Sequence, residues 1–182
     1  MYISIKITEM TSQDLSPNEH HPHYSQYIDL VPKEESLVQA LHSGRDQTVD
    51  FFESLDETKI NYRYAEGKWT PKEILMHLID TERVFTYRAL RFARKDTTPL
   101  QGFDQDDYIR PSKVYSRSLA SLVAEFKSVR ASTLSLFEFM DEDMLKSIGV
   151  ASNSNLSARA AGFITAGHSR SHIQIIKDRY LS

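Results

Sequence analysis

The strongest constraint on the fold is a helix start signal at Thr70, Pro71 and Glu73, which opens a long run without glycine or proline. Threonine is a preferred N-cap, proline fits the first helical position, and a glutamate three residues after the N-cap completes a capping box. Nothing interrupts the run before about residue 94, so we predict a helix over residues 71–94. One side of this helix carries residues at three- and four-residue steps: Ile74, His77, Thr81, Val84, Phe85 and Arg88.

Three further runs show the same helical spacing of apolar residues. They predict helices over about residues 33–55, 117–140 and 157–181, with Pro32 just before the first and Ser157 as the N-cap of the last. Four long helices with one apolar stripe each can bury those stripes against one another, and the sequence contains no convincing sheet. We therefore predict an all-α fold, a four-helix bundle.

The composition is that of an ordinary globular chain. With 182 residues, 40% of them hydrophobic and 26% charged, we expect a single domain, residues 1–182. The net charge of -3 gives no electrostatic basis for binding nucleic acid or an anionic membrane surface. No run approaches the ~18 apolar residues of a membrane span, and the N-terminus has no secretory signal. A soluble, cytoplasmic protein that acts on a small molecule is the expectation.

The first part of the chain is harder to assign. Residues 1–32 are predicted to be an irregular extension, with a short strand over residues 2–7. Within it, His20, His21 and His23 cluster beside two prolines. Histidine-rich tracts can bind metal, but we interpret this one as a surface segment that wraps the bundle, and its role stays open.

A long crossover is predicted between the second and third helices, over residues 95–115. It is longer than the ~2–8 residues that usually join bundle helices, and long structured loops are often functional. The sequence supports two interpretations of this loop equally: it covers one end of the bundle, or it is a solvated connection. Asp104 in this loop is a candidate general base, although a weak one.

The chemistry of the chain centres on the HxxxH motif of His168 and His172 in the last helix. Residues four apart project from one helix face about 5–6 Å from each other, so both imidazoles can reach one metal ion. His77 adds a third nitrogen if its helix packs beside the last one, which leaves positions open for water or substrate. Taken alone, however, an inward histidine such as His77 is more often a hydrogen-bonded core residue. For the HxxxH pair, a metal site and a pair of core residues are equally supported, because two buried imidazoles are costly unless both find a hydrogen-bond or metal partner.

The residue types restrict the metal and exclude several other sites. The chain has no cysteine, so histidine, carboxylate or water must supply the ligands. Ligand softness favours Zn²⁺ or Ni²⁺, with Fe²⁺ or Mn²⁺ as further candidates. There is no HExxH for a zincin and no helical Glu-x-x-His for a di-iron centre. GxSxG, Walker A and GxGxxG motifs are also absent.

Two segments carry a family resemblance. Residues 68–83 (KWTPKEILMHLIDTER) and residues 166–173 (AGHSRSHI) resemble the motifs of the second and fourth helices in the DinB/YfiT-like family of metalloenzymes. The likeness extends from about residue 24 to the C-terminus and includes the crossover at residues 99–104. Together the two motifs are fairly specific, and either one alone is not.

The resemblance implies an up-down-down-up bundle, a metal site at His77, His168 and His172, and a homodimer. Some related proteins resemble metal-dependent transferases that use a low-molecular-weight thiol, and others have been regarded as hydrolases. Our sequence-based hypothesis is a metal-dependent enzyme that activates either an exogenous thiol or water. The alternative is a non-catalytic bundle that binds metal or a partner.

Overall fold

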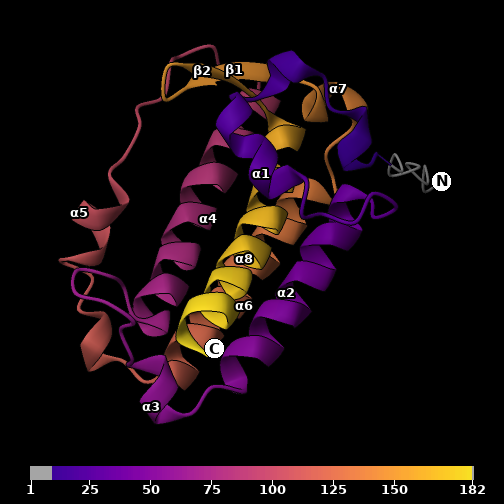
Figure 1. Cartoon of the computed structure of the whole chain (residues 1–182). Helices are drawn as coiled ribbons and strands as arrows, with labels where there is room; N and C mark the ends of the chain where they lie inside the picture. Colours follow the sequence, from indigo (N-terminus) through magenta and orange to yellow (C-terminus); the bar gives the residue numbers. More distant parts are fainter. Residues whose placement is uncertain (1–9, 182) are drawn as a thin grey trace.

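The computed structural model describes residues 10–181 and is dominated by four long helices (Figure 1). These are α2 (Leu37–Glu53), α4 (Pro71–Ala93), α6 (Leu119–Phe137) and α8 (Ala158–Tyr180). Helices α8 and α6 each pack against both α2 and α4, so the order around the bundle is α2, α8, α4, α6. In Figure 1, α4 and α6 run in one direction while α2 and α8 run in the other. This is the predicted up-down-down-up four-helix bundle.

The helix ends follow local capping. Thr70 caps α4 and Ser157 caps α8, as predicted. The first helix begins at Leu37, and the prediction of a start near residue 33 was wrong. Ser36 accepts a hydrogen bond from the Gln39 backbone N–H while the Gln39 side chain accepts one from the Ser36 N–H, so this capping box sets the start. The other ends differ from the prediction by one to three residues, a normal scatter for helix boundaries.

Short elements fill the connections. They are the 3₁₀ turns η1 (Ser12–Asp14), η2 (Pro17–Glu19), η3 (Pro22–Tyr24) and η4 (Val114–Ser116), the helical turns α1 (Ser25–Ile28), α3 (Glu57–Ile60), α5 (Gln105–Ile109) and α7 (Glu142–Leu145), and the strands β1 (Ile148–Ala151) and β2 (Ser154–Ser157). The strand expected at residues 2–7 lies outside the described residues.

The hairpin of β1 and β2 was not predicted. We had interpreted the segment before the last helix as a polar connection, but its strands pair antiparallel, with Ala151 opposite Ser154. The two turn residues, Ser152 and Asn153, both adopt positive φ, as a two-residue hairpin turn requires. The crossover is attached to this hairpin, because the Leu100 N–H donates to the Val150 carbonyl (2.9 Å) and the Ser152 N–H donates to the Leu100 carbonyl (3.0 Å).

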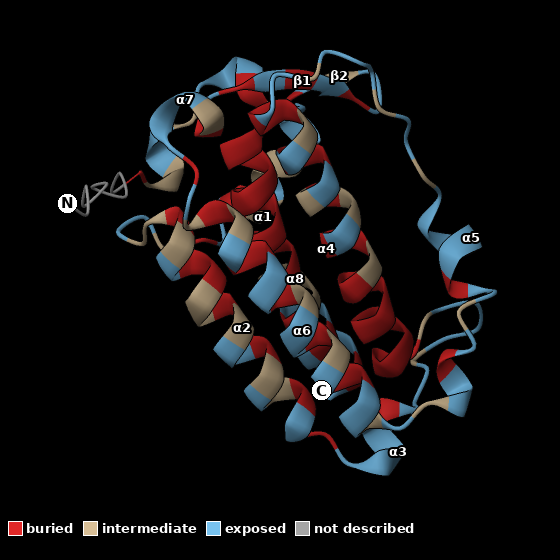
Figure 2. Ribbon diagram, turned by 180° about the vertical axis from the view of Figure 1, so that it is seen from behind, coloured by how far each residue is buried: buried red, intermediate tan, exposed pale blue. Residues whose placement is uncertain are grey.

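The extension before α2 lies over α8 (Figure 1). Its α1 turn approaches so closely that a Cβ on Gly167 would lie 1.8 Å from the Tyr27 carbonyl oxygen. Glycine at position 167 therefore allows the extension to reach the helix that carries the HxxxH motif. With α1, the hairpin and two neighbouring helices around it, the first half of α8 is almost entirely buried (Figure 2).

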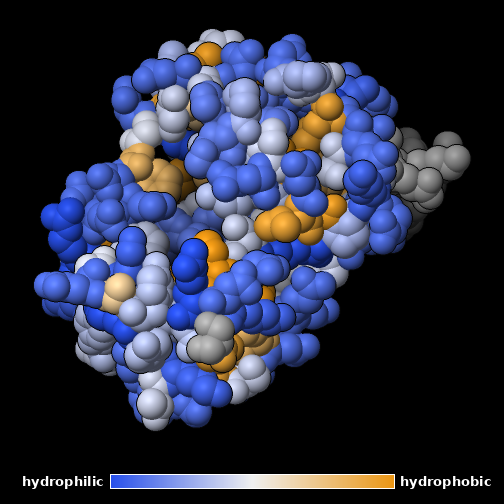
Figure 3. Space-filling model, viewed as in Figure 1, coloured by the Kyte–Doolittle hydropathy of each residue, from blue (hydrophilic) through white to orange (hydrophobic). Residues whose placement is uncertain are grey.

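The hydropathy of the surface agrees with a bundle whose apolar side chains face inward. The face seen in Figure 3 is mainly hydrophilic, with apolar side chains gathered in small areas. No helix of residues 10–181 is both long and apolar enough to cross a membrane.

Candidate metal centre

The structure brings the three predicted histidines together between α4 and α8. The Nε2 atoms of His77 and His168 are 3.1 Å apart, and those of His168 and His172 are 3.0 Å apart. Ligand atoms of all three residues, the histidine triad, lie within 4.8 Å of one another. Within residues 10–181 it is the one such cluster of three or more histidines and carboxylates.

Local sequence fixes where each ring projects. Glu73 Oε2 accepts from the Thr70 N–H (2.7 Å) and Thr70 Oγ1 accepts from the Glu73 N–H (3.2 Å), so α4 begins rigidly one turn before His77. On α8 the four-residue spacing places His168 and His172 on one face, with ring centroids 4.6 Å apart. Contact between α4 and α8 then closes the triad.

Neighbouring side chains hold the rings in place. The Trp69 indole lies 4.9 Å from the His77 ring, and Tyr27 from the N-terminal extension meets the His168 ring edge-on at 5.1 Å. The Thr81 hydroxyl is 3.3 Å from His77 Nδ1. If Thr81 accepts the Nδ1 proton, the Nε2 lone pair of His77 points at the other two rings.

The triad is held in its neutral form. Burial, followed by repulsion from His172, lowers the pKa of His77 to about 3. Burial lowers the pKa of His172 to about 4, and burial together with both neighbours places the pKa of His168 well below its ordinary value. All three imidazoles are thus uncharged near neutral pH, the form that ligates metals.

The donor set fits a divalent cation. His168 Nε2 contacts two other Nε2 atoms, yet a neutral ring can either donate one proton or accept with one lone pair there, so both contacts cannot be good hydrogen bonds. Nitrogens bound to one metal at about 2.0–2.1 Å lie roughly 3 Å apart, which matches the observed spacing. His172 Nδ1 is buried without a hydrogen-bond partner, so no described residue fixes the tautomer of that ring.

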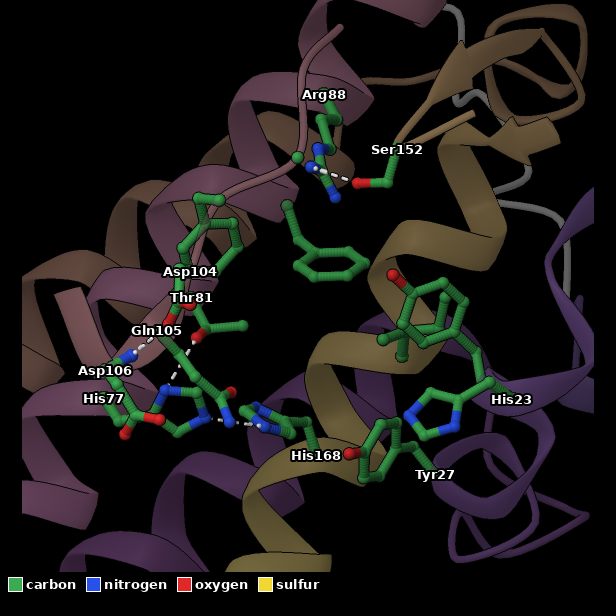
Figure 4. Close-up of a pocket in the computed structure, with 15 residues that line it drawn as sticks. His23, Tyr27, His77, Thr81, Arg88, Asp104, Gln105, Asp106, Ser152 and His168 are labelled. Atoms are coloured by element: carbon green, nitrogen blue, oxygen red, sulfur yellow. Dashed lines mark hydrogen bonds between the residues drawn. The ribbon is translucent and has the colours of Figure 1, made fainter. Parts of the chain in front are cut away.

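A pocket of about 770 Å³ opens beside the triad (Figure 4). His77 and His168 form part of its wall, and the crossover supplies Asp104, Gln105 and Asp106. The crossover therefore contributes to a cavity, which favours the functional interpretation of this loop over a solvated connection. Asp104 is exposed, and its Oδ1 accepts from the Asp106 N–H (2.9 Å), so it also caps α5.

The histidine cluster of the extension separates in the structure. The ring of His23 lines the pocket, and His21 Nδ1 accepts from the His23 backbone N–H at 3.1 Å. His20 and His21 are not among the pocket residues. The seventh histidine, His42, lies at the surface 3.7 Å from Glu138.

Sequence reasoning missed several residues of the pocket wall. Tyr24 and Tyr27 reach it only because the extension folds over α8, which periodicity does not reveal. Arg88 carried a signal, because it stands on the same side of α4 as His77 and Thr81. A charged residue on the inward side of a helix is a candidate for a functional site.

Comparisons with known proteins agree with this geometry. A family model described as the DinB superfamily matches residues 40–176. The fold is similar to a solved structure described as "YfiT from Bacillus subtilis is a probable metal-dependent hydrolase with an unusual four-helix bundle topology". The TM-score is 0.71 with 15% sequence identity, over 88% of this chain and 93% of that chain, which establishes a common fold. No curated protein matches the sequence.

Proposed function

Because the chain belongs to the DinB superfamily, we propose that it is a metal-dependent enzyme whose divalent ion is held by His77, His168 and His172. The observation that carries this proposal is the convergence of three neutral imidazoles beside a pocket large enough for a small-molecule substrate, with the buried His77 and His168 in its wall. Zn²⁺ and Ni²⁺ suit a set of nitrogen ligands best, with Fe²⁺ and Mn²⁺ as further candidates.

We propose hydrolysis as the reaction. A divalent ion held by the triad would lower the pKa of the group that attacks the substrate. The description of YfiT as a probable metal-dependent hydrolase supports water as that group. A low-molecular-weight thiol is the second candidate, and it would have to come from outside the protein because the chain has no cysteine.

The residues of the chain prepare the site for either nucleophile. Thr81, Trp69 and Tyr27 fix the orientation of two ligand rings, which reduces the reorganisation needed on binding. Outside the triad, Asp104 and His23 are among the pocket groups that can accept a proton from the nucleophile.

Metal analysis of untagged protein tests the ligand set. We expect about one divalent ion per chain, and loss of that ion in His77→Ala, His168→Ala and His172→Ala with helicity retained. Matched controls are His42→Ala, at the surface, and His20→Ala, in the extension. If the triple variant of the triad kept its full metal content, the proposed site would be wrong.

Activity assays separate an enzyme from a binding module. Protein loaded in turn with Zn²⁺, Ni²⁺, Mn²⁺ and Fe²⁺ is tested for hydrolysis of simple esters and amides and for addition of a thiol to a generic electrophile. Activity that disappears in His168→Ala supports the enzyme. Absence of activity in every assay would favour the non-catalytic bundle that binds metal or a partner.

We also propose a homodimer, since related proteins typically dimerise. Light scattering is expected to give twice the 21.0 kDa mass of the chain. A mass equal to that of one chain at micromolar concentration would contradict the dimer and leave the metal site unaffected.

A further inference from the structure

Three arginines of the bundle are almost completely buried, and one of them differs from the others. Arg130 is 0% exposed and forms a fork to both carboxylate oxygens of Glu82 at 2.7 and 2.9 Å. Arg159 is 5% exposed and holds both oxygens of Glu19. Arg88 is 2% exposed and forms no ion pair with any carboxylate of residues 10–181.

Arg88 lies in the wall of the triad pocket (Figure 4). Its Nη2 donates to the Gln101 carbonyl oxygen and to Ser152 Oγ, both at 3.0 Å. The Tyr24 hydroxyl lies beside the guanidinium, and the Phe85 ring centroid is 5.2 Å from the guanidinium carbon. All of these neighbours are uncharged groups.

The two hydrogen bonds from Nη2 make Arg88 a tether between α4, the crossover and the hairpin, but a tether does not require a charge. Burying an unpaired cation costs several kcal/mol, and arginine does not escape this cost by losing its proton. Both tether bonds come from Nη2, so the Nε and Nη1 groups are left for Tyr24 and for a ligand. A planar fork of N–H donors beside a pocket matches a carboxylate or phosphate.

The position of Arg88 indicates which part of a ligand it would meet. His77 and Arg88 are eleven residues apart on one helix, which places their Cα atoms about 16 Å apart along α4. The guanidinium folds back over Phe85, one turn nearer the triad, and so shortens this span to roughly 10 Å. The pocket is continuous between these points, since its wall includes His77, Thr81, Phe85 and Arg88.

We propose that Arg88 binds an anionic group, a carboxylate or a phosphate, on a substrate whose reacting atom lies at the triad about 10 Å away. This inference rests on the proposed function for its second half alone, because anion binding at Arg88 does not need a metal. Asp104 and Asp106 also line the pocket, but they are exposed and do not pair with Arg88. Arg88 is therefore the buried charge among these three pocket residues, and we assign the selection of the ligand to it.

An anion titration of metal-free protein tests the site directly. Inorganic phosphate and succinate are added separately to ¹⁵N-labelled protein, and the amide signals of Gln101, Gly102 and Ser152 are followed. We expect saturable shifts in the wild type, with a half-saturation concentration at least tenfold higher in Arg88→Met because the charged hydrogen bonds are lost. The relative affinity of the two probes distinguishes phosphate from carboxylate as the preferred group.

Two variants control this titration. Arg94→Met removes an exposed arginine at the end of the same helix and is expected to change the half-saturation concentration less than twofold. Arg88→Lys keeps the charge but loses the fork, so it should bind with intermediate affinity and serves if Arg88→Met does not fold. Absence of saturable shifts in the wild type, or the same half-saturation concentration for the wild type and Arg88→Met, would overturn the proposal.

A series of linear hydroxamates that end in a carboxylate tests the distance to the triad. In metal-loaded protein, affinity should peak at a chain of about 10 Å between the two ends. The carboxylate should improve binding over the matching amide in the wild type but not in Arg88→Met. A flat length dependence with intact anion binding would refute the link to the triad alone, whereas absence of metal together with intact anion binding would refute the proposed function alone.

Discussion

Two of the polar clusters in the bundle core are stabilised in opposite ways. Glu82 and Arg130 join α4 to α6 through two charged hydrogen bonds, and Arg130 Nη1 also donates to the Leu41 carbonyl at 2.8 Å. The histidine triad joins α4 to α8 without any opposite charge, through nitrogen atoms that cannot all satisfy one another. The two clusters are near neighbours, since a cavity of about 10 Å³ has Glu82, Arg130 and His168 among its walls.

From this difference we infer that the ion pair has a structural role and the triad a functional one. The ion pair is complete within the chain, so it needs no ligand and specifies how α4 and α6 pack. The triad is complete only when something positive or proton-donating occupies the space between its nitrogens. Removing a member of the pair should therefore damage the fold, and removing a member of the triad should damage binding.

The largest effect is expected for Glu82→Ala. It leaves Arg130 buried without a counter-charge, which costs about 3–5 kcal/mol in the free energy of unfolding. Urea denaturation measures this loss. The matched control is Glu53→Ala, whose partner Lys127 is half exposed, and there we expect less than about 1 kcal/mol. Similar losses in the two variants would contradict the structural role of the buried pair.

Acid should destabilise the metal-free protein through the triad. A histidine whose pKa is lower in the folded state binds fewer protons than the unfolded chain, so stability falls as pH drops below about 6.5. The folded pKa of His172 is about 4, so protonation of this residue should cost roughly 3 kcal/mol of the free energy of unfolding by the time the pH has fallen to about 4. Denaturation at several pH values measures the loss. It should shrink in His172→Phe and persist in His42→Phe, and a loss of the same size in both would refute the assignment.

Metal should stabilise the wild type and leave a triad variant unchanged. At a free metal concentration of 100 times Kd, binding to the folded state adds about 2.7 kcal/mol to the free energy of unfolding. We expect this gain in thermal or urea unfolding of the wild type with Zn²⁺ or Ni²⁺, and its absence in His168→Ala. An equal gain in both proteins would place the metal elsewhere, for instance at His20 and His21.

The two clusters also differ in how far sequence could predict them. The three histidines could be found because each lies on the inward side of a long helix whose start is marked by an N-cap, at Thr70 or Ser157. The fold itself followed from four apolar stripes. Neither periodicity nor motif paired Glu82 with Arg130, because a charged residue at the edge of a stripe is usually solvated and its partner is 48 residues away in the sequence.

What sequence could not predict depends on contacts between distant segments. The hairpin requires positive φ at Ser152 and Asn153, and serine gives no clear signal for that conformation. The docking of α1 depends on the absence of a Cβ at Gly167, which reads as an ordinary small residue in a helix. Tyr27 and His23 reach the pocket only after that docking, so the sequence showed the three histidines but not the pocket wall beside them.

The smallest effect is expected for Thr81→Val, which tests how the His77 ring of the triad is oriented. Thr81→Val keeps the shape of the side chain but removes the hydroxyl 3.3 Å from His77 Nδ1. Because such an outer hydrogen bond fixes the tautomer and orientation of a metal ligand, its loss should weaken metal affinity about tenfold with little change in metal-free stability. Competition with a chromogenic chelator measures the affinity.

Thr165→Val is the matched control for that measurement. Thr165 is also a buried threonine, but its hydroxyl donates to the Ala161 carbonyl of its own helix (2.9 Å) and contacts no triad nitrogen. We expect its metal affinity to stay within twofold of the wild type. An equal loss in both variants would mean that general packing around α8 holds the rings, and the specific role of the Thr81 hydroxyl would then be wrong.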